Sequence, residues 1–217
     1  MLQLARERGV GNLSVIPGHK TMPAALRLLF ARNPAIDGLL CPGHVATIIG
    51  AEAFAFLPRG LHKPAAIAGF GAAEIMRGVY SLLLMAEQGR AGLVNCYPRA
   101  VRAGGNPRAQ AALAEVFCPA DAVWRGLGLI PESGLALREE YAGFDALARF
   151  ADCIRAGESR DEHMGCRCGE VLRGELEPEG CPLFGAICDP EHPAGACMVS
   201  QEGSCAAAFR YQRAEQG

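Results

Sequence analysis

Six of the ten cysteines lie in one short stretch of the chain, between Gly165 and Cys205. Thiolates are soft ligands for zinc and for iron–sulfur clusters, and they are also the reactive groups of redox proteins. Glycine and proline residues separate these cysteines, so the backbone can wrap around a small inorganic centre. We therefore expect this stretch to bind a metal centre. The six cysteines are Cys166, Cys168, Cys181, Cys188, Cys197 and Cys205.

The spacing of these cysteines distinguishes between kinds of centre. Zinc ribbons use two C-x2-C pairs, and the stretch contains none. Gaps of 12, 6 and 16 residues run from Cys168 through Cys181 and Cys188 to Cys205. An iron–sulfur cluster tolerates such irregular gaps, because its four thiolates only have to converge in space. The pattern favours a cluster over a zinc-stabilised interaction module, and a thiol oxidoreductase that uses Cys166 and Cys168 is the third hypothesis.

Two histidines follow apolar runs in similar contexts. A Pro-Gly-His motif ending at His19 follows the run 13–16, and a second one ending at His44 follows the run 36–40. Ligands of open α/β sheets gather beyond the carboxyl ends of the strands, where imidazole is a metal ligand or a proton carrier. We expect both histidines at equivalent strand ends; the alternative is that each one only packs its own loop. Cys41 could add a thiolate there, or serve as a small apolar side chain.

These motifs fit a repeated order of elements in the first half of the chain. Apolar runs at 13–16, 36–40 and 65–70 each lead through a loop into a segment whose apolar residues have helical spacing. Alternation of strand and helix is typical of a parallel sheet with helices packed on it. We expect an α/β, Rossmann-like sheet with flanking helices in residues 1–112. A small cysteine-rich iron–sulfur domain of helices and loops is expected in residues 113–217.

Two further elements are predicted in the middle of the chain. A helix should begin after Asn106, because asparagine is a favoured amino-terminal cap and Pro107 suits the first helical position. The proline, serine and glycine of residues 131–134 predict a turn. An amphipathic helix is expected after that turn, ending near Phe150.

Composition and charge exclude several classes of function. The chain has 21 Lys and Arg against 23 Asp and Glu, so it carries no basic field for nucleic acid. No apolar run approaches the roughly 20 residues that cross a bilayer, and the first residues lack the apolar core of a signal peptide. We expect a cytoplasmic protein without nucleic acid or membrane partners. NAD binding is not expected, because Glu74 stands where a dinucleotide loop has its third glycine.

The longer motifs of the chain resemble, in order, those of the HypD family, the scaffold proteins of [NiFe]-hydrogenase maturation. The resemblance extends from about Leu13 to Tyr211. Several long and unusual motifs in the correct order make it specific. The motifs are CPGHVATIIG, GFGAAEIMRGVYSLLLM, GNPRAQAALAEVF, WRGLGLIPESGLALREEYAGFDA, CRCGEVLRGELEP, CPLFGAICDPEHPAGACMVSQEGSC and AAAFRY.

The resemblance implies cofactors and partners. HypD proteins form a complex with the small chaperone HypC, receive cyanide ligands by way of HypE, and carry an Fe(CN)2(CO) fragment destined for the hydrogenase. His44 would lie near the cleft where this iron is assembled, and Cys166 and Cys197 would be neighbours of the cluster. The implied role is a redox-active assembly scaffold rather than a conventional turnover enzyme. A [4Fe-4S] cluster that supplies electrons would be held by Cys168, Cys181, Cys188 and Cys205.

The chain departs from the family pattern at two motifs. Family members carry a C-G-G-H-T-H motif, whose thiolate binds the nascent iron, and a G-P-G-C-P-V-C motif, which supplies a redox thiol pair. Neither motif occurs in this sequence. We therefore expect the chain to correspond to a carboxyl-terminal part of the family pattern, incomplete at its amino end, that keeps the cluster module.

Overall fold

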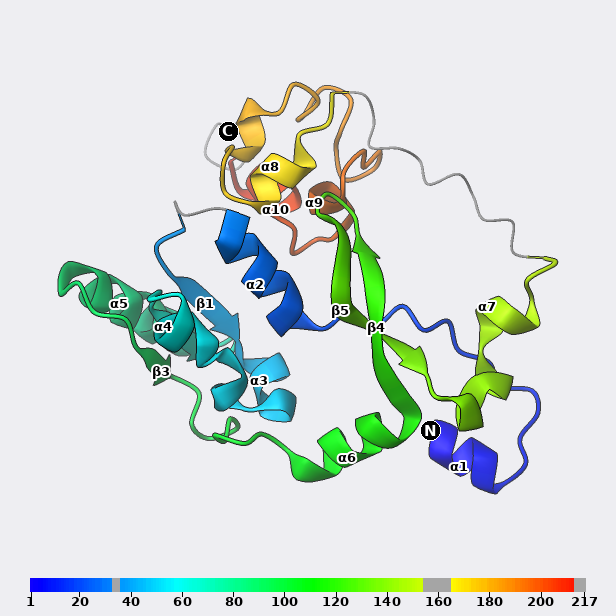
Figure 1. The fold of residues 1–217 in the computed structure, drawn as a ribbon. Coiled ribbons are helices and arrows are strands. Elements are labelled where there is room, and N and C mark those ends of the chain that lie inside the picture. Colours follow the sequence, from blue (N-terminus) through cyan, green and yellow to red (C-terminus); the bar gives the residue numbers. More distant parts are fainter. Residues whose placement is uncertain (33–35, 154–164, 213–217) are drawn as a thin grey trace. The chain divides into compact units, whose positions relative to one another are not determined.

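The computed structural model describes residues 1–32, 36–153 and 165–212 (Figure 1). It confirms the α/β class, with a three-stranded parallel sheet, flanking helices and a cysteine-rich carboxyl-terminal region. The chain divides into two units, and the domain boundary predicted at residue 112 stays a prediction. Unit 1 consists of Met1–Gly11, Ile36–Cys118 and Ala136–Tyr141, and unit 2 of Asn12–Ala35, Pro119–Leu135 and Ala142–Gly217.

Unit 1 is built around the parallel sheet, whose strand order is β1-β2-β3. Every residue of the central strand β2 is buried, as is typical of a parallel strand that is covered on both faces. The strands predicted at 36–40 and 65–70 are confirmed, although the first begins three residues later than expected. The strands are β1 (Leu39–Pro42), β2 (Ala65–Ala68) and β3 (Leu93–Asn95), and their register pairs Leu39 with Ala65 and Ala65 with Leu93.

The helices of unit 1 follow the strands closely in the sequence. α5 packs on β1 and β2, and a Cβ atom at its Gly78 would lie 2.5 Å from Leu40 Cδ1, so glycine permits this close approach. The helix predicted after Asn106 is confirmed, because the Asn106 side chain accepts a hydrogen bond from the backbone N–H of Ala109 at 3.2 Å. The helices are α1 (Leu2–Glu7), α3 (Gly43–Ile49), η1 (Ala51–Phe54), α4 (Phe56–Gly60), α5 (Ala72–Glu87) and α6 (Pro107–Val116).

The remaining elements include a two-stranded sheet and several short helices. β4 (Phe117–Trp124) and β5 (Gly128–Leu137) form this hairpin. α2 (Met22–Arg32) is the longest helix of unit 2 among the described residues. The short helices are η2 (Glu139–Phe144), α7 (Ala146–Arg149), α8 (Cys168–Leu172), η3 (Pro178–Gly180), α9 (Ala196–Val199) and α10 (Ser204–Gln212).

Three predictions for these segments are wrong. The run 13–16 is not a strand of the sheet, and it makes only an isolated parallel bridge between Val15 and Asp145. Residues 131–134 lie inside β5, because pairing with β4 outweighs their turn propensity, and a two-stranded sheet tolerates proline at its edges. The long helix expected after them is replaced by η2 and α7, since the Asp145 side chain accepts from Leu147 N at 2.8 Å and caps a new, short helix there.

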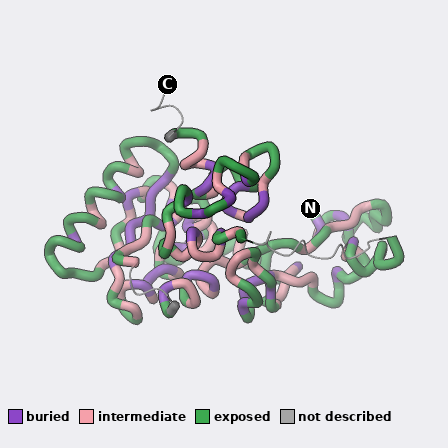
Figure 2. The backbone as a smooth tube through the Cα atoms, turned by 90° about the horizontal axis from the view of Figure 1, so that it is seen from above, coloured by how far each residue is buried: buried purple, intermediate pink, exposed green. Residues whose placement is uncertain are grey.

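Burial in unit 1 is greatest between the sheet and its helices. In Figure 2 the buried backbone lies on the inner turns of the tube and the exposed backbone on the outer turns of the helices. Four large side chains of this unit are at most 2% exposed, and these are Phe54, Leu57, Ile67 and Tyr141. The apolar spacing that predicted strands and helices therefore also selects the residues of this core.

We predict that Gly43→Ala destabilises unit 1. A Cβ atom at Gly43 would lie 2.5 Å from Ala68 O and 2.7 Å from Tyr97 Cδ1, so the start of α3 would have to move away from β2. The expected loss in free energy of unfolding is about 1–3 kcal/mol, measured by urea denaturation. Gly60→Ala is the matched control, because nothing lies within 4 Å of its added Cβ atom. Equal destabilisation by both variants would contradict the prediction.

Candidate functional site

The cysteines of the carboxyl-terminal region form the centre of a core within unit 2. Cys166 is half-buried at the margin of this core. Its buried large apolar side chains are Val171, Leu183 and Met198, and four partly buried ones pack against it, namely Leu172, Leu176, Phe184 and Phe209. Five of the ten buried residues of this core are cysteines, which share it with these apolar side chains. The five buried cysteines, each only 2–7% exposed, are Cys168, Cys181, Cys188, Cys197 and Cys205.

Short helices and tight turns place these thiols. α8 begins at Cys168, and Cys181 follows η3 directly. Cys197 lies in α9 and Cys205 in α10, and the three helices α8, α9 and α10 contact one another. The core therefore gathers cysteines that are up to 37 residues apart in the sequence, from Cys168 to Cys205. The structure places the four predicted ligands in one core, and their role as ligands stays a prediction.

Backbone N–H groups point at two of the sulfur atoms. Ala194 N donates to Cys188 Sγ at 3.3 Å, and Cys197 N donates to Cys168 Sγ at 3.4 Å. Hydrogen bonds to sulfur favour the thiolate form and tune the reduction potential of iron–sulfur clusters. The Sγ atoms of Cys197 and Cys205 lie 3.0 Å apart, so Cys197 is an integral member of the thiol core.

The tip of the β4–β5 hairpin braces the thiol core within unit 2. Arg125 Nη2 donates to the carbonyl oxygen of Ala194 at 2.6 Å. Gly126 has a positive φ of 84°, and its carbonyl oxygen would lie 2.6 Å from a Cβ atom at Gly169 in α8. Sequence reasoning did not assign a role to Arg125 or Gly126. The available signal was the W-R-G-L-G motif, whose glycines permit this close approach.

Gly195 also lies where a side chain would not fit, beside the C-x-C pair. A Cβ atom at Gly195 would lie 2.8 Å from Cys166 Sγ and 2.9 Å from Cys168 Cβ. The backbone can therefore pass directly next to the C-x-C pair only because residue 195 has no side chain. Sequence reasoning missed Gly195, although the small residues before Cys197 were a usable signal.

Three thiols of the cysteine-rich region, those of Cys166, Cys168 and Cys205, have raised pKa values. The pKa of Cys168 is raised, first by its hydrogen bond with Cys197 and second by burial. Burial is the main cause of the raised pKa of Cys205 and of Cys166, and nearby thiols oppose ionisation of both. Several thiolates in this core would repel one another unless a cationic centre were bound among them. A soft donor set of this kind fits a soft metal centre.

The two cysteines of the C-x-C motif differ in their surroundings. Cys168 is almost fully buried and is hydrogen-bonded to Cys197. Cys166 lies at the margin of the core, where thiolates at Cys181 and Cys188 would raise its pKa. Within the described ranges, no three His, Cys, Asp or Glu side chains converge as ligands of a single metal ion. Cys166 and Cys168 therefore lie in the same core but differ in burial and in hydrogen bonding.

His44 and His19 do not occupy equivalent positions. His44 lies in the first turn of α3, directly after β1 in unit 1, and its exposed ring is 4.6 Å from that of Phe70 between centroids. His19 belongs to unit 2 and follows the segment that makes only the Val15 bridge. The expectation of two equivalent strand ends is therefore wrong, because 13–16 is not part of the sheet.

Cys41 is a buried residue of β1 and is only 1% exposed. Burial raises the pKa of its thiol from 9.0 to about 12. At neutral pH the side chain is therefore a small uncharged group inside the unit. This supports the interpretation of Cys41 as a packing residue rather than as a thiolate beside His44.

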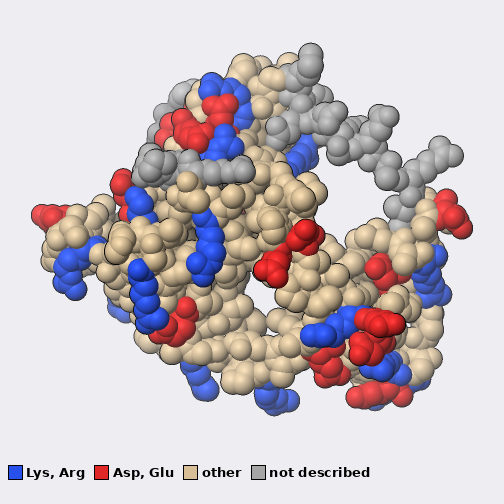
Figure 3. All heavy atoms as spheres, in the orientation of Figure 1, with Lys and Arg blue, Asp and Glu red and all other residues tan. Residues whose placement is uncertain are grey.

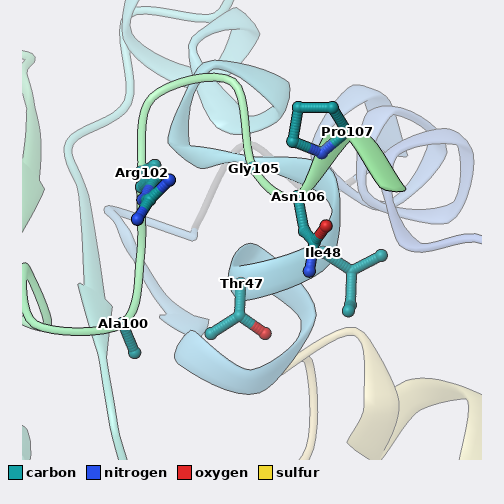
Figure 4. A pocket seen from close by; sticks show the side chains of 7 residues that line it. All are labelled: Thr47, Ile48, Ala100, Arg102, Gly105, Asn106 and Pro107. Carbon is teal, nitrogen blue, oxygen red and sulfur yellow. The ribbon is translucent and has the colours of Figure 1, made fainter. Parts of the chain in front are cut away.

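A pocket of about 290 Å³ lies next to α3 in unit 1 (Figure 4). Its wall is fixed by backbone contacts, since Asn106 N and the Gln110 side chain both donate to Ile48 O. Neither His44 nor Cys41 lines it. The residues that do are Thr47, Ile48, Ala100, Arg102, Gly105, Asn106 and Pro107.

Three observations concern the functions that the sequence did not predict, namely nucleic-acid binding, NAD binding and membrane insertion. Basic and acidic side chains are interspersed on the face shown in Figure 3. Gly71 N donates to Glu74 Oε2 at 3.3 Å, so a carboxylate stands at the start of α5, where a dinucleotide loop would bind phosphate. No helix in the described part of the chain is both long and apolar enough to span a bilayer.

Together these features define an α/β protein with a separate, thiol-centred core in its carboxyl-terminal region. The family model for HypD, described as the hydrogenase formation hypA family, matches residues 1–212. The chain is 40% identical to the hydrogenase maturation factor HypD of Azotobacter vinelandii over 223 residues, which cover 100% of this chain and 58% of the relative. It is likewise 40% identical to HypD of Escherichia coli, with 99% of this chain and 57% of the relative covered.

The chain therefore belongs to the HypD family of hydrogenase maturation factors. This confirms the resemblance that the sequence motifs carried. The chain spans somewhat less than three fifths of the length of the curated relatives it matches.

We predict that Cys41 is nearly inert toward alkylation at pH 8. Its buried thiol has a pKa of about 12, so the reactive thiolate is scarce. Iodoacetamide should modify it at least about a hundredfold more slowly than the exposed Cys153, as measured by peptide mass spectrometry.

The same raised pKa has a consequence for stability. Between pH 9 and about 12 the Cys41 thiol stays protonated in the folded chain but ionises in the unfolded chain, so the free energy of unfolding should fall as the pH rises through this window. A Cys41→Ala variant should lose this contribution to the pH dependence. Rapid labelling of Cys41 in the folded chain would contradict both expectations.

Proposed function

We propose that this chain is a redox-active module of hydrogenase maturation that holds a [4Fe-4S] cluster in the core of unit 2. The proposed ligands are Cys168, Cys181, Cys188 and Cys205. The observation that carries the proposal is the burial of five cysteines in one core, where they are half of the ten buried residues. Membership of the HypD family supports it independently, because the relatives are named hydrogenase maturation factors.

The surroundings of the thiols suit a redox centre. When bound, a cluster of this type supplies or accepts single electrons. The backbone N–H groups of Ala194 and Cys197 point at sulfur atoms and would favour the more negative, reduced state. Arg125 holds the carbonyl of Ala194, and the absence of a side chain at Gly195 lets the backbone pass next to the C-x-C pair.

Two alternatives use the same residues differently. A zinc-stabilised interaction module would use four of the thiols structurally, and the purified protein would be colourless with about one zinc per chain. A thiol oxidoreductase needs an accessible thiolate of low pKa. The raised pKa values of Cys166, Cys168 and Cys205 argue against the second alternative.

We predict that anaerobically purified protein is brown, with broad visible absorption that bleaches on reduction and about four iron and four sulfide per chain. Cys181→Ala, Cys188→Ala and Cys205→Ala should each lower iron and sulfide content by more than about half. Cys118→Ala and Cys153→Ala are the controls, since both residues lie outside the thiol core. A colourless protein with stoichiometric zinc, or equal loss in the controls, would overturn the cluster assignment.

A matched pair of variants, Cys168→Ala and Cys166→Ala, identifies the fourth ligand. Cys168→Ala should reduce iron content to the level of the other ligand variants, whereas Cys166→Ala should leave most of it. The reverse result would assign the position to Cys166, which lies beside the same thiols. In either case the losing cysteine acts on the cluster only as a neighbour.

By family membership we also propose that this module works with HypC-type and HypE-type proteins on an iron that carries cyanide and carbon monoxide. That iron is cargo, and strong-field ligands require soft or anionic donors beside them. The chain lacks the C-G-G-H-T-H thiolate, and Cys41 is a buried, uncharged thiol. His44 is exposed after β1 and is the proposed cleft residue.

We predict that this chain by itself does not retain the Fe(CN)2(CO) cargo. Protein co-expressed with the other maturation proteins should show no cyanide or carbon monoxide stretching bands in the infrared, although it still contains its cluster. Clear bands that disappear in His44→Ala but persist in His62→Ala would show that the cargo site is complete in this chain.

A further inference from the structure

The pocket beside α3 in unit 1 has a wall made of two backbone segments in close contact (Figure 4). Gly105 has a positive φ of 73°, and a Cβ atom on it would collide with Ile48 O and lie 2.5 Å from Gly50 N. Glycine alone permits this approach. Ala51 N also donates to Arg102 O at 3.1 Å. These contacts fix the loop before α6 against the end of α3, so the pocket is formed before any ligand arrives.

The carbonyl oxygens of this wall are used by donors of the protein itself. Ile48 O accepts from Asn106 N at 3.0 Å and from the side-chain Nε2 of Gln110 at 2.8 Å. Gln110 Nε2 also donates to Gly104 O at 2.7 Å. These acceptors are therefore already satisfied, and the side chains decide what the pocket offers to a ligand.

Two side chains of the pocket keep hydrogen-bond donors in reserve. Asn106 Oδ1 accepts from Ala109 N at 3.2 Å, which orients the amide, and Asn106 Nδ2 has no partner among the described residues. The exposed guanidinium of Arg102 likewise makes no hydrogen bond or ion pair within the described part of the chain. Thr47 Oγ1 donates to His44 O at 2.6 Å, so toward the pocket it can only accept.

The charge around the pocket is positive. Among the described residues that line it, Arg102 is the only charged one. Residues 88–114 contain four arginines and neither Asp nor Glu. η1, which contacts this loop, contributes one carboxylate, that of Glu52, and Arg59 engages it at 3.2 Å. The charge of Arg102 is therefore left for a ligand.

We propose that this pocket binds a small phosphate-bearing anion through Arg102 and Asn106. A guanidinium pairs with two oxygens of a phosphate at once, and the amide Nδ2 can donate to a third. Thr47 Oγ1 can accept from the protonated oxygen of a phosphate monoanion, and a carboxylate has no such proton at neutral pH.

The size of the pocket limits what this anion can be. Its volume of about 290 Å³ is at the lower end of ligand pockets, which suits inorganic phosphate or a small phosphate monoester. The site uses no thiol and lies in unit 1, so it can fail without affecting the proposed cluster, and the reverse also holds.

The test is isothermal titration calorimetry of the whole chain with sodium phosphate, at constant ionic strength so that non-specific attraction stays screened. We expect saturable binding of one phosphate per chain, with a dissociation constant of about 1 mM. Arg102→Gln should weaken binding at least about tenfold, because it removes the charge-assisted hydrogen bonds. Arg108→Gln is the matched control, since Arg108 belongs to the same arginine-rich segment but does not line the pocket.

Asn106→Asp is a second variant that preserves the fold. Aspartate can also accept from Ala109 N, so the cap of α6 is kept. The amide donor, however, becomes a carboxylate that repels phosphate, and binding should be lost while the circular dichroism spectrum is unchanged.

Glycerol 3-phosphate and acetate are the comparison ligands. Binding of the ester at least as tightly as phosphate would identify a monoester as the ligand, and weaker binding of the ester would identify inorganic phosphate. The absence of saturable phosphate binding would overturn the proposal. So would acetate binding as tight as that of phosphate, or equal weakening by Arg102→Gln and Arg108→Gln.

Discussion

The burial of five thiols in one small core is the constraint on which the carboxyl-terminal region depends. Five cysteines occupy its centre, and the helices that carry them, α8, α9 and α10, have only four to nine residues each. Such helices are too short to be stable by themselves. With the proposed cluster bound, metal–thiolate bonds would close the loops between these helices and add to the packing of their apolar side chains. Folding of this region and insertion of the proposed cluster are therefore expected to be coupled.

The raised pKa values of the thiols follow from the same constraint. In a core without a cation, the hydrogen bond with Cys197 and then burial raise the pKa of Cys168, and burial is the main cause of the raised pKa of Cys166 and Cys205. A bound metal centre reverses this preference, because it offsets the negative charge of each thiolate. The N–H groups of Ala194 and Cys197 are already directed at sulfur, so the core is prepared for thiolates. Redox chemistry in this family member would then depend on the centre and not on free thiols.

Unit 1 is ordered by strand pairing and close backbone packing rather than by buried thiols. Its three parallel strands and the close packing at Gly43 and Gly78 fix the start of α3, and with it the position of His44 relative to Phe70. Unit 2 differs at residues 13–16, which make only an isolated bridge between Val15 and Asp145. In unit 1, by contrast, the central strand β2 is paired on both sides.

The sequence by itself determined the α/β class, the strands β1 and β2, the capped helix α6, the family, and the concentration of cysteines in one region. These features depend on local patterns, namely apolar spacing, capping residues and long motifs, which can be recognised without knowledge of the tertiary contacts. Only the tertiary structure decided that 13–16 lacks a sheet, that Pro131 and Gly134 lie within β5, and that Cys197 belongs to the thiol core. Strand pairing and sulfur contacts join residues far apart in the chain, so no local pattern encodes them. Cys41 is a further example. Its residue type allowed either a ligand role or a packing role, and its burial in β1 favours the packing role.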